Sequence, residues 1–118
     1  MKIYVAAKFE ERAVLRLIVR SLTDLGHEVT AAWITREELH LPQHMIALED
    51  LRGVDEADLV ILDTTYPGGS GREVEFGYAL AKGKKVWMLG PFVNVFHYHQ
   101  GVQHFNDWIQ VVLALKGV

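Results

Sequence analysis

The sequence contains no cysteine, which excludes disulfide bonds and metal sites built from thiolates. It has no apolar run near the roughly 20 residues that cross a bilayer, so we expect no membrane partner. It also has no basic run, and its formal net charge is −3, which argues against a nucleic-acid polymer as partner. The first residues, "MKIYVAAKF", lead into a charged segment without a visible secretory leader, and a cytoplasmic location is therefore expected.

The composition favours one compact domain over residues 1–118. Half of the residues are hydrophobic and 23% are charged, as in chains that build a packed core. A domain of this size buries only about two-thirds of the surface of its extended chain. We therefore expect a homo-oligomer, in which a neighbouring subunit could complete a site.

Apolar segments with strand character alternate with segments of helical periodicity. Strands are predicted at residues 2–7, 27–34, 58–63, 84–90 and 101–105, and helices at residues 9–27, 42–57, 71–82 and 106–118. This order predicts an α/β fold, a single doubly wound domain of the flavodoxin or Rossmann type, with a parallel sheet of four to five strands flanked by helices. In such sheets the ligand lies beyond the carboxyl ends of the strands, where segments 6–9, 63–71 and 90–97 should meet.

Three local features refine this prediction. The first helix should bury a stripe of apolar residues, namely Val14, Leu15, Ile18, Leu22 and Leu25. Gly53 is expected to interrupt or kink the second helix. Thr35 and Glu38 have the spacing of a capping box, which predicts a helical turn between the second strand and that helix.

The segment "YPGGSGRE" predicts a glycine-rich loop that ends at a helix N-terminus, where a bound anion is favoured. It lacks the Gly-Lys-Ser/Thr ending of a phosphate-binding Walker loop. Glu73 and Glu75 follow, about 200° apart on an ideal helix, so only one can face the strand ends. The helix dipole would keep a carboxylate near this end ionised, as helix capping or a carboxylate nucleophile requires.

Further candidates are aspartates, a tyrosine and histidines. Asp63 ends the central predicted strand, where it could bind a ligand or cap a loop, and Asp50 lies on the preceding helix. Tyr4 could place its hydroxyl in a site or simply pack in the core. His97 and His99 have chelating spacing but no nearby carboxylate, so we predict no metal site and no cofactor.

Taken together, these residues resemble the nucleoside 2-deoxyribosyltransferase superfamily, which includes the 2'-deoxynucleoside 5'-monophosphate N-glycosidases. The strongest stretch is "VEFGYALAKGKKVWML", and "DLRGVDEADLVILD" and "KIYVAAKF" support it. The resemblance implies an enzyme that acts on a small deoxynucleoside or deoxynucleotide and a free nucleobase. It further implies that Glu75 is the nucleophile that forms a covalent deoxyribosyl ester, with Asp50 and Tyr4 as active-site partners.

The resemblance also suggests where the substrate binds. The family's phosphate-binding segment after the first strand is replaced here by "AAKFEE", which leaves Ala7 and Lys8 as candidates. Asp63 could hold the sugar hydroxyl. The loop residues Gly69, Ser70, Gly71 and Arg72 could hold the 5' end of the sugar. Asn94 and His97 are candidates for a contribution to a neighbouring subunit's site.

The sequence leaves other functions open. Water could replace the acceptor base, which would make the protein an N-glycoside hydrolase that releases base and deoxyribose or its 5-phosphate. The same fold could be a catalytically silent nucleotide-binding module. A phospho-acceptor domain with Asp63 as acceptor is disfavoured, since it needs an acidic pair directly after the first strand, where the sequence reads "AKF".

Overall fold

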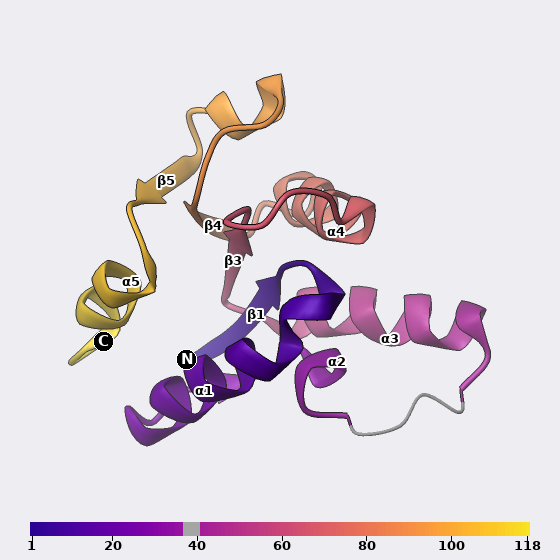
Figure 1. Cartoon of the computed structure of the whole chain (residues 1–118), viewed down its shortest axis with the longest axis horizontal. Coiled ribbons are helices and arrows are strands. Elements are labelled where there is room, and N and C mark those ends of the chain that lie inside the picture. Colours follow the sequence, from indigo (N-terminus) through magenta and orange to yellow (C-terminus); the bar gives the residue numbers. More distant parts are fainter. Residues whose placement is uncertain (37–40) are drawn as a thin grey trace.

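The computed structural model describes residues 1–36 and 41–118, and its elements alternate along the chain as the hydrophobic pattern predicts (Figure 1). Glu38, half of the capping box expected with Thr35, lies outside the described residues. The strands are β1 (Lys2–Ala6), β2 (Glu28–Val29), β3 (Leu59–Asp63), β4 (Lys85–Leu89) and β5 (Val102–Phe105). The helices are η1 (Phe9–Glu11), α1 (Arg12–Asp24), α2 (Ala32–Thr35), α3 (Gln43–Glu56), α4 (Ser70–Ala81), η2 (Val95–Tyr98) and α5 (Trp108–Leu115).

The five strands form one parallel sheet in the order β2-β1-β3-β4-β5, which confirms the predicted fold class. The strand order reverses between β1 and β3. The connections that leave these two strands therefore diverge to opposite faces of the sheet and open a crevice at their carboxyl ends.

Helices cover both faces of the sheet. α3 and α4 contact each other and the central strands on one face, whereas α1 and α5 lie together on the other (Figure 1). β1 and β3 form the centre of the core, and every residue of β3 is buried, as expected of a strand covered on both faces. Among the described residues, no helix has the length and apolar character needed to cross a membrane.

The second strand is much shorter than the predicted 27–34. β2 pairs only with β1 at the sheet edge, and the chain turns into α2 after Thr30. The Trp33 indole donates a hydrogen bond to the Val5 carbonyl at 3.2 Å, which draws this turn over the end of β1. Trp33 and Ile34 are consecutive and both buried, which suits a helical turn rather than an edge strand.

Two expectations about helices are corrected. In α1, Val14 is exposed, and Val19 packs against the core beside Leu15 and Leu22. In α3, Gly53 lies within a continuous helix and does not break it. Its role is close approach: a Cβ at Gly53 would lie 2.7 Å from the Thr30 carbonyl oxygen and 2.9 Å from the Tyr4 ring.

We expect Gly53→Ala to lower the free energy of unfolding by about 1–3 kcal/mol, because the added methyl group overpacks the contact between α3 and β1. Gly77→Ala is the matched control, since Gly77 is also a helical glycine but has open space where its Cβ would lie. That change should raise stability by up to about 1 kcal/mol through helix propensity. Urea denaturation measures both, and equal effects at the two glycines would contradict the packing account.

Candidate active site

A pocket of about 280 Å³ lies at the carboxyl ends of β1 and β3, where the strand order reverses. Its walls come from the segment after β1, from α2 and the residue after it, from α3, and from the N-terminus of α4. The lining residues are Ala7, Phe9, Glu10, Trp33, Arg36, Ile46, Asp50, Gly69, Ser70, Gly71, Arg72 and Glu75. Two of the three segments expected at the crevice therefore reach it, while segment 90–97 does not.

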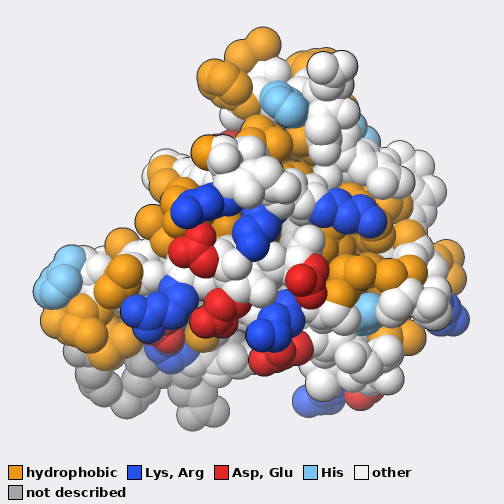
Figure 2. All heavy atoms as spheres, turned by 180° about the vertical axis from the view of Figure 1, so that it is seen from behind, with side chains coloured by type: hydrophobic (Ala, Val, Ile, Leu, Met, Phe, Trp, Pro, Cys, Tyr) orange, Lys and Arg blue, Asp and Glu red, His pale blue; other side chains and the backbone are white. Residues whose placement is uncertain are grey.

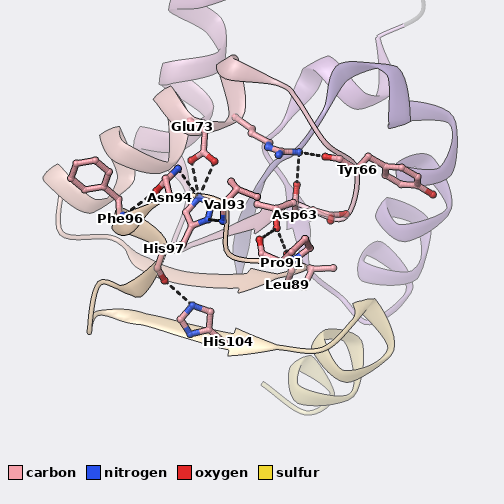
Figure 3. A network of polar contacts seen from close by, with 12 residues as sticks. Asp63, Tyr66, Glu73, Leu89, Pro91, Val93, Asn94, Phe96, His97 and His104 are labelled. Atoms are coloured by element: carbon pink, nitrogen blue, oxygen red, sulfur yellow. Dashed lines mark hydrogen bonds and ion pairs between the residues drawn. The ribbon is translucent and has the colours of Figure 1, made fainter.

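The two glutamates of α4 lie on different sides of the helix. Glu73 points to His97 (Figure 3), whereas Glu75 lines the pocket. This is consistent with their expected angular separation. Only Glu73 belongs to the first turn, where the helix dipole acts most strongly. The expectation of a readily ionised Glu75 is corrected accordingly: burial raises its pKa to about 8, and the nearby Asp50 adds to the increase.

Tyr4 lies close to Glu75, although it does not line the pocket. Its side chain is fully buried in β1, and its hydroxyl is buried without a hydrogen-bond partner among the described residues. The hydroxyl nevertheless lies close enough to Glu75 to lower that carboxyl's pKa, which partly offsets the effect of burial. Burial and the neighbouring Glu75 and Asp50 charges raise the pKa of Tyr4, so it stays protonated and can donate to an ionised Glu75.

Asp50 reaches the same pocket from α3. Burial raises the pKa of its carboxyl, and the Arg36 guanidinium opposes that increase. Asp50 lies three residues before Gly53, whose contact with Tyr4 fixes the distance between α3 and β1. The structure thus brings together Glu75, Asp50 and Tyr4 from three different elements.

The N-terminus of α4 forms an anion-favouring wall of the pocket. Gly69 is the N-cap, with a left-handed φ of 88° that favours glycine, and no side chain caps the helix. The first amides of the helix therefore remain available to a ligand. Lys8 runs alongside: its Cα and Cβ lie 3.5 and 3.6 Å from where a Cβ on Gly69 would be.

Arg72 and Asp63 hold the loop before α4 in place, and Figure 3 labels Asp63 at its start and Tyr66 within it. A terminal guanidinium nitrogen of Arg72 donates to the Tyr66 carbonyl at 2.7 Å, and its buried Nε has no partner among the described residues. One carboxylate oxygen of Asp63 accepts hydrogen bonds from the amide and hydroxyl of Thr65, and the other accepts one from the Trp108 indole at 2.8 Å. Asp63 does not line the pocket, and we leave it out of the proposed substrate contacts.

His97 and Asn94 lie on the side of α4 that carries Glu73 (Figure 3), and neither lines the pocket that Glu75 lines. His97 is fully buried, and its Nε2 lies 2.8 and 2.9 Å from the two carboxylate oxygens of Glu73. The amide of Val93 donates to its Nδ1 at 3.1 Å, so the proton belongs on Nε2. Asn94 caps η2 by accepting from the Phe96 amide. His97 is thus occupied within its own subunit, and we also leave it out of the proposed substrate contacts.

Sequence reasoning missed several pocket residues. Trp33 and Arg36 come from a segment predicted as strand and connection, and Glu10 comes from the start of a predicted helix. Phe9 belongs to segment 6–9, which was expected at the crevice, although no role was predicted for its side chain. The available signal was the Phe-Glu-Glu segment shortly after β1, at the carboxyl end of a central strand. Among residues 1–36 and 41–118, no group of three or more histidine, aspartate or glutamate side chains is placed to hold a metal ion.

A model of a known protein family matches most of the chain. The family model described as nucleoside 2-deoxyribosyltransferase matches residues 3–106, which include every pocket residue. The chain belongs to the nucleoside 2-deoxyribosyltransferase family. No curated protein sequence matches the chain.

Two solved structures share the deoxyribosyltransferase-type fold over nearly the whole chain. The CMP N-glycosidase BcmB of Clostridium botulinum matches with a TM-score of 0.75 and 22% identity, over 98% of each chain. A conserved protein of Enterococcus faecalis matches with a TM-score of 0.79 and 18% identity, over 98% of this chain and 97% of the other. At these identities the likeness establishes the fold alone.

The raised pKa of Glu75 has a consequence for stability. Because the folded value of about 8 lies above the ordinary 4.5, the folded protein holds more protons than the unfolded chain between those pH values. The protonated Glu75 carboxyl therefore makes its full contribution to the free energy of unfolding below about pH 4.5. That contribution is lost as the pH rises to about 8.

We expect wild type to lose stability relative to Glu75→Gln across this window, by up to about 1.4 kcal/mol per pH unit. Denaturant unfolding of both proteins between pH 5.5 and 9 measures the difference. Glu56→Gln, at the exposed end of α3, is the control and should follow wild type in parallel. A constant difference between wild type and Glu75→Gln would show that the carboxyl titrates normally.

Proposed function

We propose that the protein cleaves the N-glycosidic bond of 2'-deoxynucleosides or their 5'-monophosphates through a covalent ester on Glu75. The observation that carries this proposal is that Glu75 and Asp50 line one pocket at the switch point of the sheet, with the buried Tyr4 hydroxyl close enough to Glu75 to lower its pKa. Family membership supports N-glycosidic chemistry and a small nucleoside or nucleotide as substrate.

The reaction proceeds in two displacements at the anomeric carbon. An ionised oxygen of Glu75 attacks C1', the bond from C1' to the base nitrogen breaks, and its electron pair leaves with the base, which takes up a proton. The transition state is oxocarbenium-like, as in retaining glycoside chemistry. A water molecule or a second base then attacks C1', and the Glu75 carboxylate is released.

Each partner of Glu75 has a distinct task. The Tyr4 hydroxyl orients the carboxylate and stabilises its ionised form before attack. Asp50, with a raised pKa, is suited to protonate the departing base or to hold the sugar 3'-hydroxyl. This mechanism uses protein side chains alone, and it requires no cofactor.

The 5' end of the sugar is proposed to lie at the N-terminus of α4. The free amides around Ser70 and Gly71, with Lys8 beside them, suit an anion such as a 5'-phosphate. The Arg72 Nε, buried and unpaired among the described residues, adds a possible donor. The shared fold with a CMP N-glycosidase is a further reason to test monophosphates alongside nucleosides.

A homo-oligomer remains part of the proposal. Exposed apolar side chains gather around η2, with Val95, Phe96 and Tyr98 each more than 60% exposed. Figure 2 shows hydrophobic side chains at the upper end of the molecule, where η2 lies in Figure 1. On the same face, acidic and basic side chains are intermixed, which does not favour a nucleic-acid polymer as partner (Figure 2).

The covalent step is tested by mass spectrometry of the intact protein after mixing with a slowly reacting 2'-fluoro deoxynucleoside or its monophosphate. We expect an added mass of one sugar on wild type, located on Glu75 by peptide mapping. Glu75→Gln should give no adduct and lose at least a thousandfold in turnover, because the nucleophile is absent.

Glu73→Gln is the matched control for this test. It lies two residues away, and its amide oxygen can still accept the His97 hydrogen bond, so adduct formation should persist. Adding a free base during turnover separates transfer from hydrolysis, since only transfer gives a new nucleoside. A protein that binds nucleosides but forms neither adduct nor product would instead be a silent binding module.

A further inference from the structure

Arg36 brings unpaired hydrogen-bond donors to the pocket wall. Its side chain is 15% exposed, and both terminal guanidinium nitrogens are buried without a hydrogen-bond partner among the described residues. One of these nitrogens lies 3.2 Å from a Glu49 carboxylate oxygen, an ion pair outside hydrogen-bond geometry. Nη1 thus has no acceptor among the described residues, and Nη2 has only the poorly aligned Glu49 carboxylate. Because buried donors without well-placed acceptors are destabilising, this arrangement suits a ligand that supplies acceptors.

The surfaces around Arg36 suit a flat ring. Trp33 and Phe9 contribute aromatic faces, with ring centroids 6.2 Å apart and planes tilted by 34°, and Ile46 adds an aliphatic wall from α3. The Trp33 indole is held in place by its hydrogen bond to the Val5 carbonyl at 3.2 Å. An aromatic base can pack against such a wall while its polar edge meets the guanidinium.

The position of Arg36 agrees with the proposed orientation of the sugar. Arg36 directly follows α2, which packs against α1 and α3, whereas the anion-favouring amides belong to α4. Glu75 and Asp50 line the same pocket between these elements. A nucleoside with its 5' end at α4 and its C1' at Glu75 therefore directs its base toward the walls that carry Arg36.

We infer that Arg36 selects substrates whose base presents two adjacent hydrogen-bond acceptors, a chemistry met by cytosine, guanine and hypoxanthine. A guanidinium offers parallel N–H groups that suit such an edge in bidentate fashion. Cytosine presents O2 beside N3, and guanine and hypoxanthine present O6 beside N7. Adenine places an amino donor beside N7, and thymine places an N–H between its carbonyls, so neither edge matches. This inference rests on the proposed function for the orientation of the nucleoside.

A purely electrostatic role is the competing explanation. Arg36 lies near enough to Asp50 to oppose the increase in that carboxyl's pKa, and it pairs with Glu49. A residue with only that role would affect every substrate alike and would shift the pH dependence of activity. Base selection would instead change the ratio between substrates.

The experiment measures binding without turnover, in Glu75→Gln protein with and without Arg36→Gln. The probes are deoxycytidine, deoxyguanosine, deoxyinosine, deoxyadenosine, thymidine and their 5'-monophosphates, titrated by calorimetry. With Arg36 present, the first three bases should bind about 5- to 150-fold more tightly than the last two. Arg36→Gln should remove most of that preference, and Arg36→Lys should restore little of it, because an ammonium lacks the fork geometry.

Arg52→Gln on the exposed face of α3 is the charge-matched control and should preserve the preference. An equal loss for all five bases, a loss confined to the monophosphates, or the absence of nucleoside binding would each overturn the inference. The covalent-adduct experiment is independent of this one, since it is run with Arg36 intact. A missing adduct together with an Arg36-dependent base preference would reject the mechanism and keep the inference.

Discussion

The burial of one carboxyl, that of Glu75, is the constraint on which the rest of the site depends. Removal from water raises its pKa to about 8, and Asp50 increases the effect. The Tyr4 hydroxyl lowers the pKa of Glu75 and so partly offsets this increase. Burial keeps that hydroxyl protonated, so it can act as a hydrogen-bond donor. The site therefore holds a carboxylate that is poorly solvated once ionised, a condition that favours nucleophilic attack and makes its charge state sensitive to pH.

Packing around β1 makes this arrangement possible. Gly53 lets α3 approach the Tyr4 ring and the Thr30 carbonyl more closely than any side chain would allow. That approach carries Asp50 toward Glu75. On the far side of α4, Glu73 anchors the helix to His97, and Asp63 and Arg72 fix the preceding loop. The polar residues outside the pocket thus position the helix that carries Glu75, the proposed nucleophile.

Much of the fold follows from the sequence, because the order of apolar strands and amphipathic helices permits few topologies. The observed strand order and the crevice at the carboxyl ends of β1 and β3 agree with the fold predicted from that order. The second strand is predicted too long because "VTAAWI" is largely apolar and contains no residue that signals a break, and only tertiary contacts show that Trp33 turns back to Val5. The expectation that Glu75 belongs to the site came from the resemblance to a family motif. The hydrophobic periodicity of the helix alone did not indicate it.

The contributions of Arg36 and Trp33 could not be predicted, because they depend on how a short connection folds over a neighbouring strand. The roles of Asp63 and His97 were also beyond sequence reasoning. Both have the chemistry of ligand contacts, and only their partners, Thr65, Trp108 and Glu73, show that the fold uses them internally. A residue type at a strand end indicates a possible function, but its neighbours decide whether the side chain is free.

The pH dependence of kcat/KM for a cleaved deoxynucleoside tests the central claim most directly. If Glu75 attacks as an ionised nucleophile, kcat/KM rises with pH and levels off above a midpoint near 8, the pKa of the free protein. If the protonated Glu75 acts instead as a general acid, kcat/KM falls through the same midpoint. A falling profile, or one without a transition near that pH, would contradict the account.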